Sequence, residues 1–237
     1  MKNIENAKKL FFDNFGSVLK IFVLNFVIAL VLGLLTEAIP PLAIFITFGL
    51  MIYSAVFIFY LYQKMIINNE RMSITEMLMD PFDLVSLKLK DLFFAGLTYL
   101  LFSVPVVILL VVMIVVALMF CFNYNSGGGV ALFIILFAVS MLFIVFYCYN
   151  LQFRFYYRVC AIIFDRDSKE FVEKHKKDIK EMSVKLFLFT LIPIVGWLIT
   201  AIFQGIYCIK IILDLNDNEG IVEAPETISV NENLFEN

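Results

Sequence analysis

The fold is decided by Leu92–Phe153, which reads LFFAGLTYLLFSVPVVILLVVMIVVALMFCFNYNSGGGVALFIILFAVSMLFIVFYCYNLQF and contains no charged side chain. A helix needs roughly 20 apolar residues to cross a hydrocarbon core of about 30 Å. These 62 residues are too many for one crossing and suit two. The turn falls at Cys121–Gly129, where glycine and asparagine interrupt the helical pattern. We therefore expect membrane segments at Leu92–Phe120 and Val130–Tyr157.

Further charge-poor stretches on both sides of this region predict three more segments, Val18–Leu35, Leu42–Gln63 and Leu186–Ile209. Pro40 and Pro41 separate the first two, because the residue before a proline disfavours the helical conformation. The runs are continuously apolar and do not alternate, which excludes a transmembrane β-barrel. The expected fold class is all-α, a polytopic transmembrane helix bundle of about five membrane segments with amphipathic cytoplasmic helices.

The composition supports the same conclusion. The chain of 237 residues is 62% hydrophobic and 16% charged, and its mean hydropathy is +0.93. An ordinary soluble domain is about 45–50% apolar and about 25% charged, and a soluble protein of this size cannot bury the excess. This excludes a water-soluble enzyme and a disordered or collagen-like chain. We expect one transmembrane domain over residues 1–215 and an acidic, disordered tail over residues 216–237.

The distribution of basic residues predicts the orientation. Four lysines precede or begin the first segment, four basic residues occupy 64–91 and nine occupy 154–185. The connections 36–41 and 121–129 contain none. Basic and non-basic connections therefore alternate, as the positive-inside rule requires for a chain whose amino terminus is cytoplasmic.

The side of the carboxyl terminus depends on the fifth segment. If Leu186–Ile209 crosses once, the tail lies outside, and Cys121 and Cys208 lie near the same face and could form a disulfide. If Pro193–Gly196 is a turn between two short membrane pieces, the tail lies inside. Lys210 slightly favours the second alternative, but the length of the stretch favours a single crossing, which we expect.

The cytoplasmic connections predict short helices. The amino-terminal Met1–Gly16 is expected to be an interfacial helix. Ser73 and Glu76 indicate a helix start, and Asp80-Pro81 indicates its end. Residues 165–185 predict a charged helix lying against anionic headgroups.

This last region carries a resemblance. IIFDRD, the charged helix and KLFLFTLIPIVGW resemble the carboxyl-terminal part of an uncharacterised family of multi-pass integral membrane proteins of low-GC Gram-positive bacteria, and AKKLFFDNFGSVLK resembles its amino-terminal segment. The residues that carry the match are Asp165, Asp167, Lys185, Leu186, Phe187, Gly196 and Trp197. The resemblance implies a helical fold in a bacterial plasma membrane, and it implies no activity.

Catalytic and metal-binding motifs are missing from the sequence. Its single histidine, His175, lies in the charged helix and is expected to be solvated, since metal sites need several convergent ligands. None of the four cysteines forms a CxxC pair, and HExxH, P-loop and GxSxG motifs do not occur. We expect no enzyme activity, no catalytic residues, no cofactor and no metal.

One polar helix face is the candidate site. Helical spacing places Tyr147, Asn150, Arg154 and Arg158 on one face at the inner end of the fourth segment. The preferred interpretation is an aromatic belt with cations that reach the headgroups. The alternative is a cytoplasm-facing groove for an anion or lipid headgroup, built from arginine forks and tyrosine hydroxyls.

Two functions follow. The first is an accessory or scaffold protein that acts through helix–helix contacts with a protein partner or as a homo-oligomer. The second is a small transporter or lipid-handling protein that uses the Arg154 and Arg158 face. The first is preferred because buried charge is not evident from the sequence and no ionisable residue lies near the middle of a predicted segment. The expected partners include membrane lipids and exclude nucleic acid.

Overall fold

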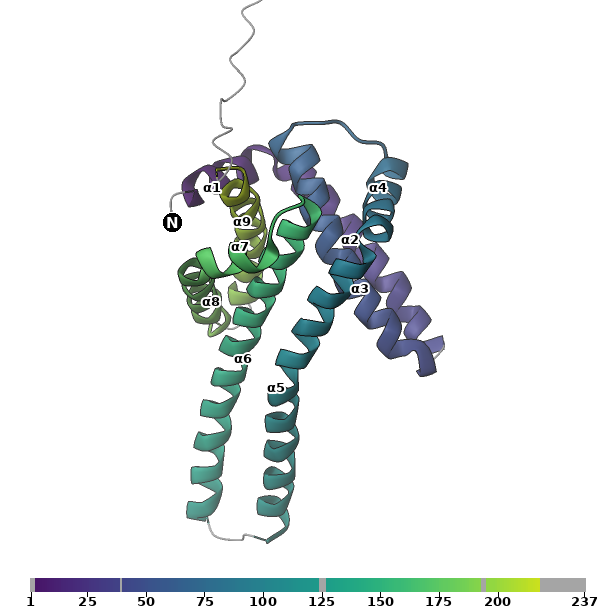
Figure 1. Cartoon of the computed structure of the whole chain (residues 1–237). Helices are drawn as coiled ribbons and strands as arrows, with labels where there is room; N and C mark the ends of the chain where they lie inside the picture. The colour runs from purple at the N-terminus through teal and green to yellow at the C-terminus, as the bar shows by residue number, and fades with distance from the viewer. Residues whose placement is uncertain (1–2, 39, 124–126, 193–194, 218–237) are drawn as a thin grey trace, which may run out of the picture.

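The computed structural model describes residues 3–38, 40–123, 127–192 and 195–217, and all of its regular structure is helical (Figure 1). This confirms the all-α fold class. The helices are α1 (Ile4–Asp13), α2 (Phe15–Ala38), α3 (Ala43–Leu61), α4 (Ile74–Leu87), α5 (Leu89–Asn123), α6 (Gly127–Ile163), α7 (Ser168–Lys174), α8 (Lys176–Thr190) and α9 (Val195–Asp217). A short turn, η1 (Pro40–Leu42), precedes α3, and a π-helical segment, η2 (Tyr62–Ile67), follows it.

Among the described residues, five helical stretches are long and apolar enough to cross a membrane. They are Phe15–Glu37, Ala43–Ile67, Leu89–Ala117, Ile134–Ile163 and Leu198–Asp217. Large apolar side chains on these helices face outward; Phe22, Leu101 and Phe143 are each about 60% exposed. Such a surface would aggregate in water, so the chain is membrane-embedded.

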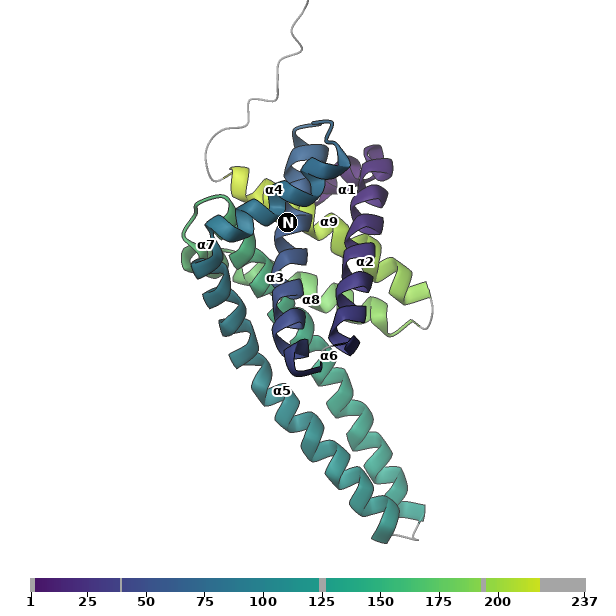
Figure 2. The same cartoon turned by 90° about the vertical axis from the view of Figure 1, so that its right-hand side faces the viewer.

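The helices form two hairpins and a compact end. Helices α5 and α6 lie side by side in a long hairpin that extends away from the rest of the molecule, and α2 and α3 form a second hairpin (Figures 1 and 2). The core lies at the opposite end from the α5–α6 connection, where α3, α6 and α9 meet. Its largest fully buried side chains include Phe57, Phe59, Phe153, Tyr157 and Tyr207.

The predicted fifth segment, Leu186–Ile209, is divided between two helices, so the expected continuous segment is wrong, and α9 alone provides the fifth stretch that is long and apolar enough to cross a membrane. Helix α8 ends at Thr190 and α9 begins at Val195, and the two helices pack against each other. Gly196 allows this close return, because a Cβ atom at this position would lie 2.0 Å from the carbonyl oxygen of Phe189. A side chain cannot occupy that space, so glycine permits the break between two helices where sequence length alone favoured one continuous helix.

The returning helix α9 brings both ends of the described chain together. The side-chain amide of Asn3 donates hydrogen bonds to Asp214 and Asp217, over 3.1 and 2.8 Å. Helix α1 packs along α9 and buries Ala7 and Phe11, so it docks on the helical core. The first and last described residues, Asn3 and Asp217, therefore lie on the same side of the molecule.

The structure also bears on the disulfide considered between Cys121 and Cys208. Cys208 is a buried free thiol on the part of α9 that packs near α1. Cys121 is in the last turn of α5, and its side chain lies outside the described part of the structure. Because Cys208 is a free thiol, the structure does not contain the Cys121–Cys208 disulfide.

The other predicted boundaries agree with the helices to within a few residues, except at α4 and at the carboxyl-terminal ends of α6 and α9. Ser73 caps α4 through a capping box with Glu76, as expected. Pro81 does not end this helix, however, and lies buried inside it. Helix α6 continues to Ile163, past the predicted Tyr157. The predicted tail, residues 216–237, lies outside the described residues beyond Asp217.

Candidate functional site

Three of the four candidate residues on α6 are directed toward α5. The hydroxyl of Tyr147 donates a hydrogen bond to the backbone oxygen of Phe102 over 3.1 Å. Arg154 and Arg158, one and two helical turns further on than Asn150, line cavities between α6 and α5. Asn150 lines neither of these cavities. The structure therefore brings Tyr147, Arg154 and Arg158 together against α5 and leaves Asn150 aside.

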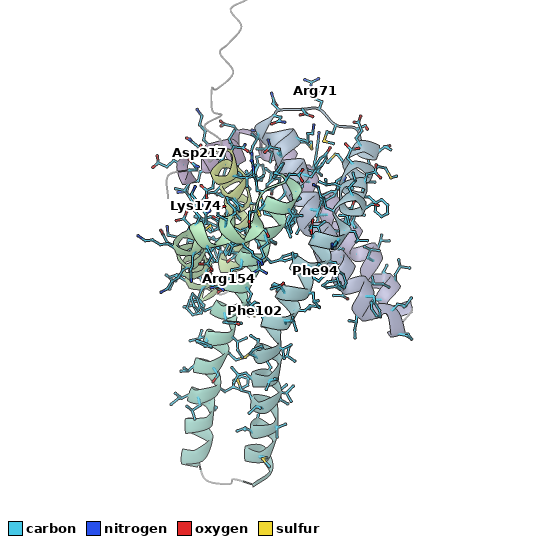
Figure 3. The ribbon with its side chains drawn as sticks, in the orientation of Figure 1. Arg71, Phe94, Phe102, Arg154, Lys174 and Asp217 are labelled. Carbon is cyan, nitrogen blue, oxygen red and sulfur yellow. The ribbon has the colours of Figure 1, made fainter. Side chains whose placement is uncertain are left out.

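The smaller cavity, of about 190 Å³, has a mixed apolar and charged lining. Arg154 and Arg158 contribute its positive charges, and Glu173 contributes a carboxylate. Its apolar and aromatic wall consists mainly of residues of α5 and α6: Tyr99, Phe102, Leu151 and Phe155. Figure 3 shows Arg154 and Phe102 where the two helices face each other. This cavity therefore extends from the charged region toward the apolar hairpin.

The larger cavity, of about 620 Å³, lies beside it toward the compact end and is mostly polar. The two share Ala95, Thr98 and Arg158. The charged side chains that line the larger cavity are Lys88, Asp91, Arg158, Asp165, Arg166, Asp167 and Lys169. Its volume is within the range of about 300–1,000 Å³ that is typical of small-molecule sites.

Of the three residues that line both cavities, Arg158 alone carries a charge. Its Nε atom is buried and has no hydrogen-bond partner among the described residues. Buried polar groups are nearly always satisfied, and an orphaned donor on a cation is costly. A guanidinium presents its donors in a planar fork that matches a carboxylate or a phosphate. The unsatisfied donor at the junction of two cavities therefore indicates an anion-binding position.

Two of the carboxylates in the larger cavity are already engaged by the protein. Asp165, which has a left-handed backbone conformation with φ 56°, forms an ion pair with Lys88. Asp167 caps α7 by accepting hydrogen bonds from the backbone N–H groups of Glu170 and Lys169. These hydrogen bonds hold the pKa of Asp167 below its ordinary value. Neither carboxylate needs a ligand to balance it.

A second polar cluster lies in the core of the compact end, and it corrects the expectation that the segments bury no charge. The Nζ atom of Lys210 is fully buried on α9 and forms ion pairs with Asp214, one turn further on, and with Asp178 of α8. The distance from Lys210 Nζ to Asp178 Oδ2 is 2.8 Å. The hydroxyl of Tyr157 also donates to Asp214, over 3.3 Å. The cluster joins α6, α8 and α9.

His175 lies at the edge of this cluster and is half-buried, contrary to the expected solvated histidine. Its ring stacks on Tyr157 with centroids 5.3 Å apart and contacts Phe171. Its Nδ1 lies 2.9 Å from the backbone oxygen of Phe171. Among the described residues, no three histidine, cysteine or acidic side chains converge as a metal site would require.

Sequence reasoning missed several of these residues. The Lys88–Asp165 ion pair spans two connections that are far apart in the chain, and only the α5–α6 hairpin brings them together. The Lys210–Asp214 pair had a sequence signal, because residues four apart share a helix face. The predicted end of the fifth segment at Ile209 excludes both residues from that segment, whereas α9 continues to Asp217.

The comparisons with known proteins add no identification. No protein-family model, no curated protein and no solved structure matches this chain.

Proposed function

We propose that the chain is a multi-pass protein of a bacterial plasma membrane with a cytoplasmic amino terminus. The alternation of basic connections supports this orientation. Asn3 contacts the carboxyl end of α9. In the proposed orientation, the carboxyl end of α9 therefore also lies on the cytoplasmic side.

Cysteine labelling in intact cells tests the proposed orientation. On a cysteine-free background, an impermeant reagent should label a cysteine placed at Gly128, and it should leave cysteines at Lys177 and Asn231 unlabelled until the cells are opened. External labelling at position 177 contradicts the proposed orientation. External labelling at position 231 alone contradicts the return of α9.

Within that topology, we propose that the chain is a non-enzymatic lipid-handling protein that holds the phosphate of a phospholipid headgroup between α5 and α6. The single observation that carries this proposal is the buried, unpartnered Nε of Arg158 where the two cavities meet. A lipid is favoured over a soluble anion because the smaller cavity continues along α5 between Tyr99 and Phe102, toward the apolar hairpin.

The scaffold function becomes the second proposal. The sequence-based preference for it rested on an apparent absence of buried charge, and Lys210 and Asp214 remove that argument. The exposed apolar side chains of the α5–α6 hairpin fit contact with lipid tails and contact with a partner helix equally. They therefore do not favour a scaffold over a lipid-handling protein.

Lipid retention tests the proposed headgroup site. The wild type and Arg158→Gln are purified in mild detergent, and retained phospholipid is measured by native mass spectrometry. Arg71→Gln is the matched control, because Arg71 is exposed and lies far from Arg154 and Phe102 (Figure 3). We expect retention to fall about tenfold in Arg158→Gln, as loss of a charge-assisted pair implies, and to stay unchanged in Arg71→Gln. Equal retention in all three proteins contradicts the proposal and returns the scaffold function to first place.

A further inference from the structure

The larger cavity contains carboxylates as well as cations, and this combination restricts the kind of headgroup it can hold. Asp165 is neutralised by Lys88, and the side chain of Asp167 is used as the cap of α7. Asp91, in the first turn of α5, lines the same cavity and is exposed. It has no ion-pair or hydrogen-bond partner among the described residues.

Arg158 thus gives the cavity a buried N–H donor without a partner, and Asp91 gives it a carboxylate without a partner among the described residues. They come from different helices, α6 and α5, and the cavity that both line is large enough for a small ligand. A purely anionic headgroup would place its negative charge near Asp91 as well, which is unfavourable. A headgroup with a phosphate and an ammonium would satisfy both residues.

We propose that the cavity selects a zwitterionic phospholipid with a primary ammonium, such as phosphatidylethanolamine, whose phosphate pairs with Arg158 and whose ammonium pairs with Asp91. This inference rests on the proposed function and names its ligand class. A primary ammonium has N–H donors for a carboxylate, and the quaternary ammonium of phosphatidylcholine has none. Phosphatidylglycerol carries the phosphate and no cation. These three headgroups therefore separate the contributions of charge and hydrogen bonding.

The test is competition among headgroups at matched acyl chains. Wild-type protein is exchanged into nanodiscs that contain equal amounts of phosphatidylethanolamine, phosphatidylglycerol and phosphatidylcholine, and bound lipid is identified by native mass spectrometry. We expect phosphatidylethanolamine to exceed each of the others by about tenfold, the factor of one charge-assisted hydrogen bond. Equal occupancy by the three lipids overturns the inference, and this result needs no variant to be folded.

Variants separate this inference from the proposed function. Asp91→Asn should retain phospholipid but lose the preference for phosphatidylethanolamine over phosphatidylglycerol, whereas Arg158→Gln should lose total retention. Asp83→Asn, an exposed carboxylate on α4 outside both cavities, is the matched control and should keep the preference. A preference unchanged in Asp91→Asn overturns the inference and leaves the phosphate site standing. Unchanged retention in Arg158→Gln contradicts the proposed function itself.

A further experiment distinguishes a bound lipid from a water-soluble ligand that carries the same phosphate and ammonium groups. Phosphorylethanolamine is added to the lipid-loaded wild type at millimolar concentration. We expect the bound lipid to remain, because the soluble headgroup lacks the acyl chains that the apolar wall of the smaller cavity would contact. Complete displacement overturns the assignment to a lipid and gives the site to a water-soluble phosphate ester with an ammonium group.

Discussion

Lys88, directly after α4, forms an ion pair with Asp165, in the turn that follows α6, and both residues line the larger cavity. The pair connects the beginning of α5 to the end of α6, at the end of the hairpin opposite the α5–α6 connection. Asp165 is 77% exposed in its side chain, so the pair adds little to stability; exposed pairs contribute about 0.2–1 kcal/mol. Its main effect is on the charge balance of the cavity.

Removing the carboxylate of this pair should release Lys88 to the cavity. Asparagine tolerates the left-handed backbone conformation of Asp165, so Asp165→Asn keeps the turn and removes the charge. We expect retention of phospholipid to increase up to about threefold, with thermal stability changed by less than about 1 kcal/mol. Native mass spectrometry of purified protein measures the change. A decrease in retention would show that the Lys88–Asp165 pair itself contacts the ligand.

The buried Lys210–Asp214 pair should respond very differently. Lys210→Met removes the ammonium that Asp214 and Asp178 share, and breaking a buried pair on one side costs about 3–5 kcal/mol. The double variant Lys210→Met with Asp214→Leu should recover part of this loss, because it removes one of the uncompensated charges. Denaturant unfolding in mixed micelles measures both. A loss below about 1 kcal/mol for Lys210→Met would contradict the buried ion pair.

The same cluster predicts a pH dependence below pH 4. Burial tends to raise the pKa of Asp178, but the hydrogen bond and the charge of Lys210 lower it below its ordinary value. A carboxylate with a lowered folded-state pKa stabilises the protein above its unfolded pKa of about 3.9, and this stabilisation disappears as the pH falls through the folded value. Stability measured from pH 6 to pH 3 should therefore fall at the acidic end.

Asp178→Asn is the control for this pH dependence. The variant should be less stable at pH 6 and should lose less stability between pH 4 and pH 3 than the wild type. Parallel profiles for the two proteins would show that Asp178 does not contribute to the acid sensitivity.

The sequence predicted the helical fold and most segments, because a long apolar run indicates a membrane-spanning helix whatever its tertiary contacts are. It failed at Gly196, where close contact between two backbones decides the turn, and at Pro81, which the interior of α4 accommodates. It found Arg154 and Arg158 from helical spacing. It could not find Asp91 or Lys88 as members of the same site, since only the packing of α5 against α6 brings these residues together.

The tight return between α8 and α9 should not tolerate a side chain. Gly196→Ala places a methyl group against the Phe189 carbonyl oxygen and should destabilise the protein by about 1–3 kcal/mol, as overpacking does. The control is Gly49→Ala in α3, where a Cβ meets no atom within 4 Å. That variant should be neutral or stabilised by about 0.5–1 kcal/mol. Equal stability of the two variants would contradict the hairpin.

The most direct measurement of the central claim is the proximity of arginine to lipid phosphorus. The chain has four arginines, so solid-state NMR with ¹⁵N-labelled arginine and natural ³¹P in bilayers can resolve short guanidinium–phosphate contacts. Wild type and Arg71→Gln should show strong ³¹P dephasing of a guanidinium signal, and Arg158→Gln should lose that component. Dephasing that is identical in Arg158→Gln and wild type would contradict the account, because the phosphate would then not lie at Arg158.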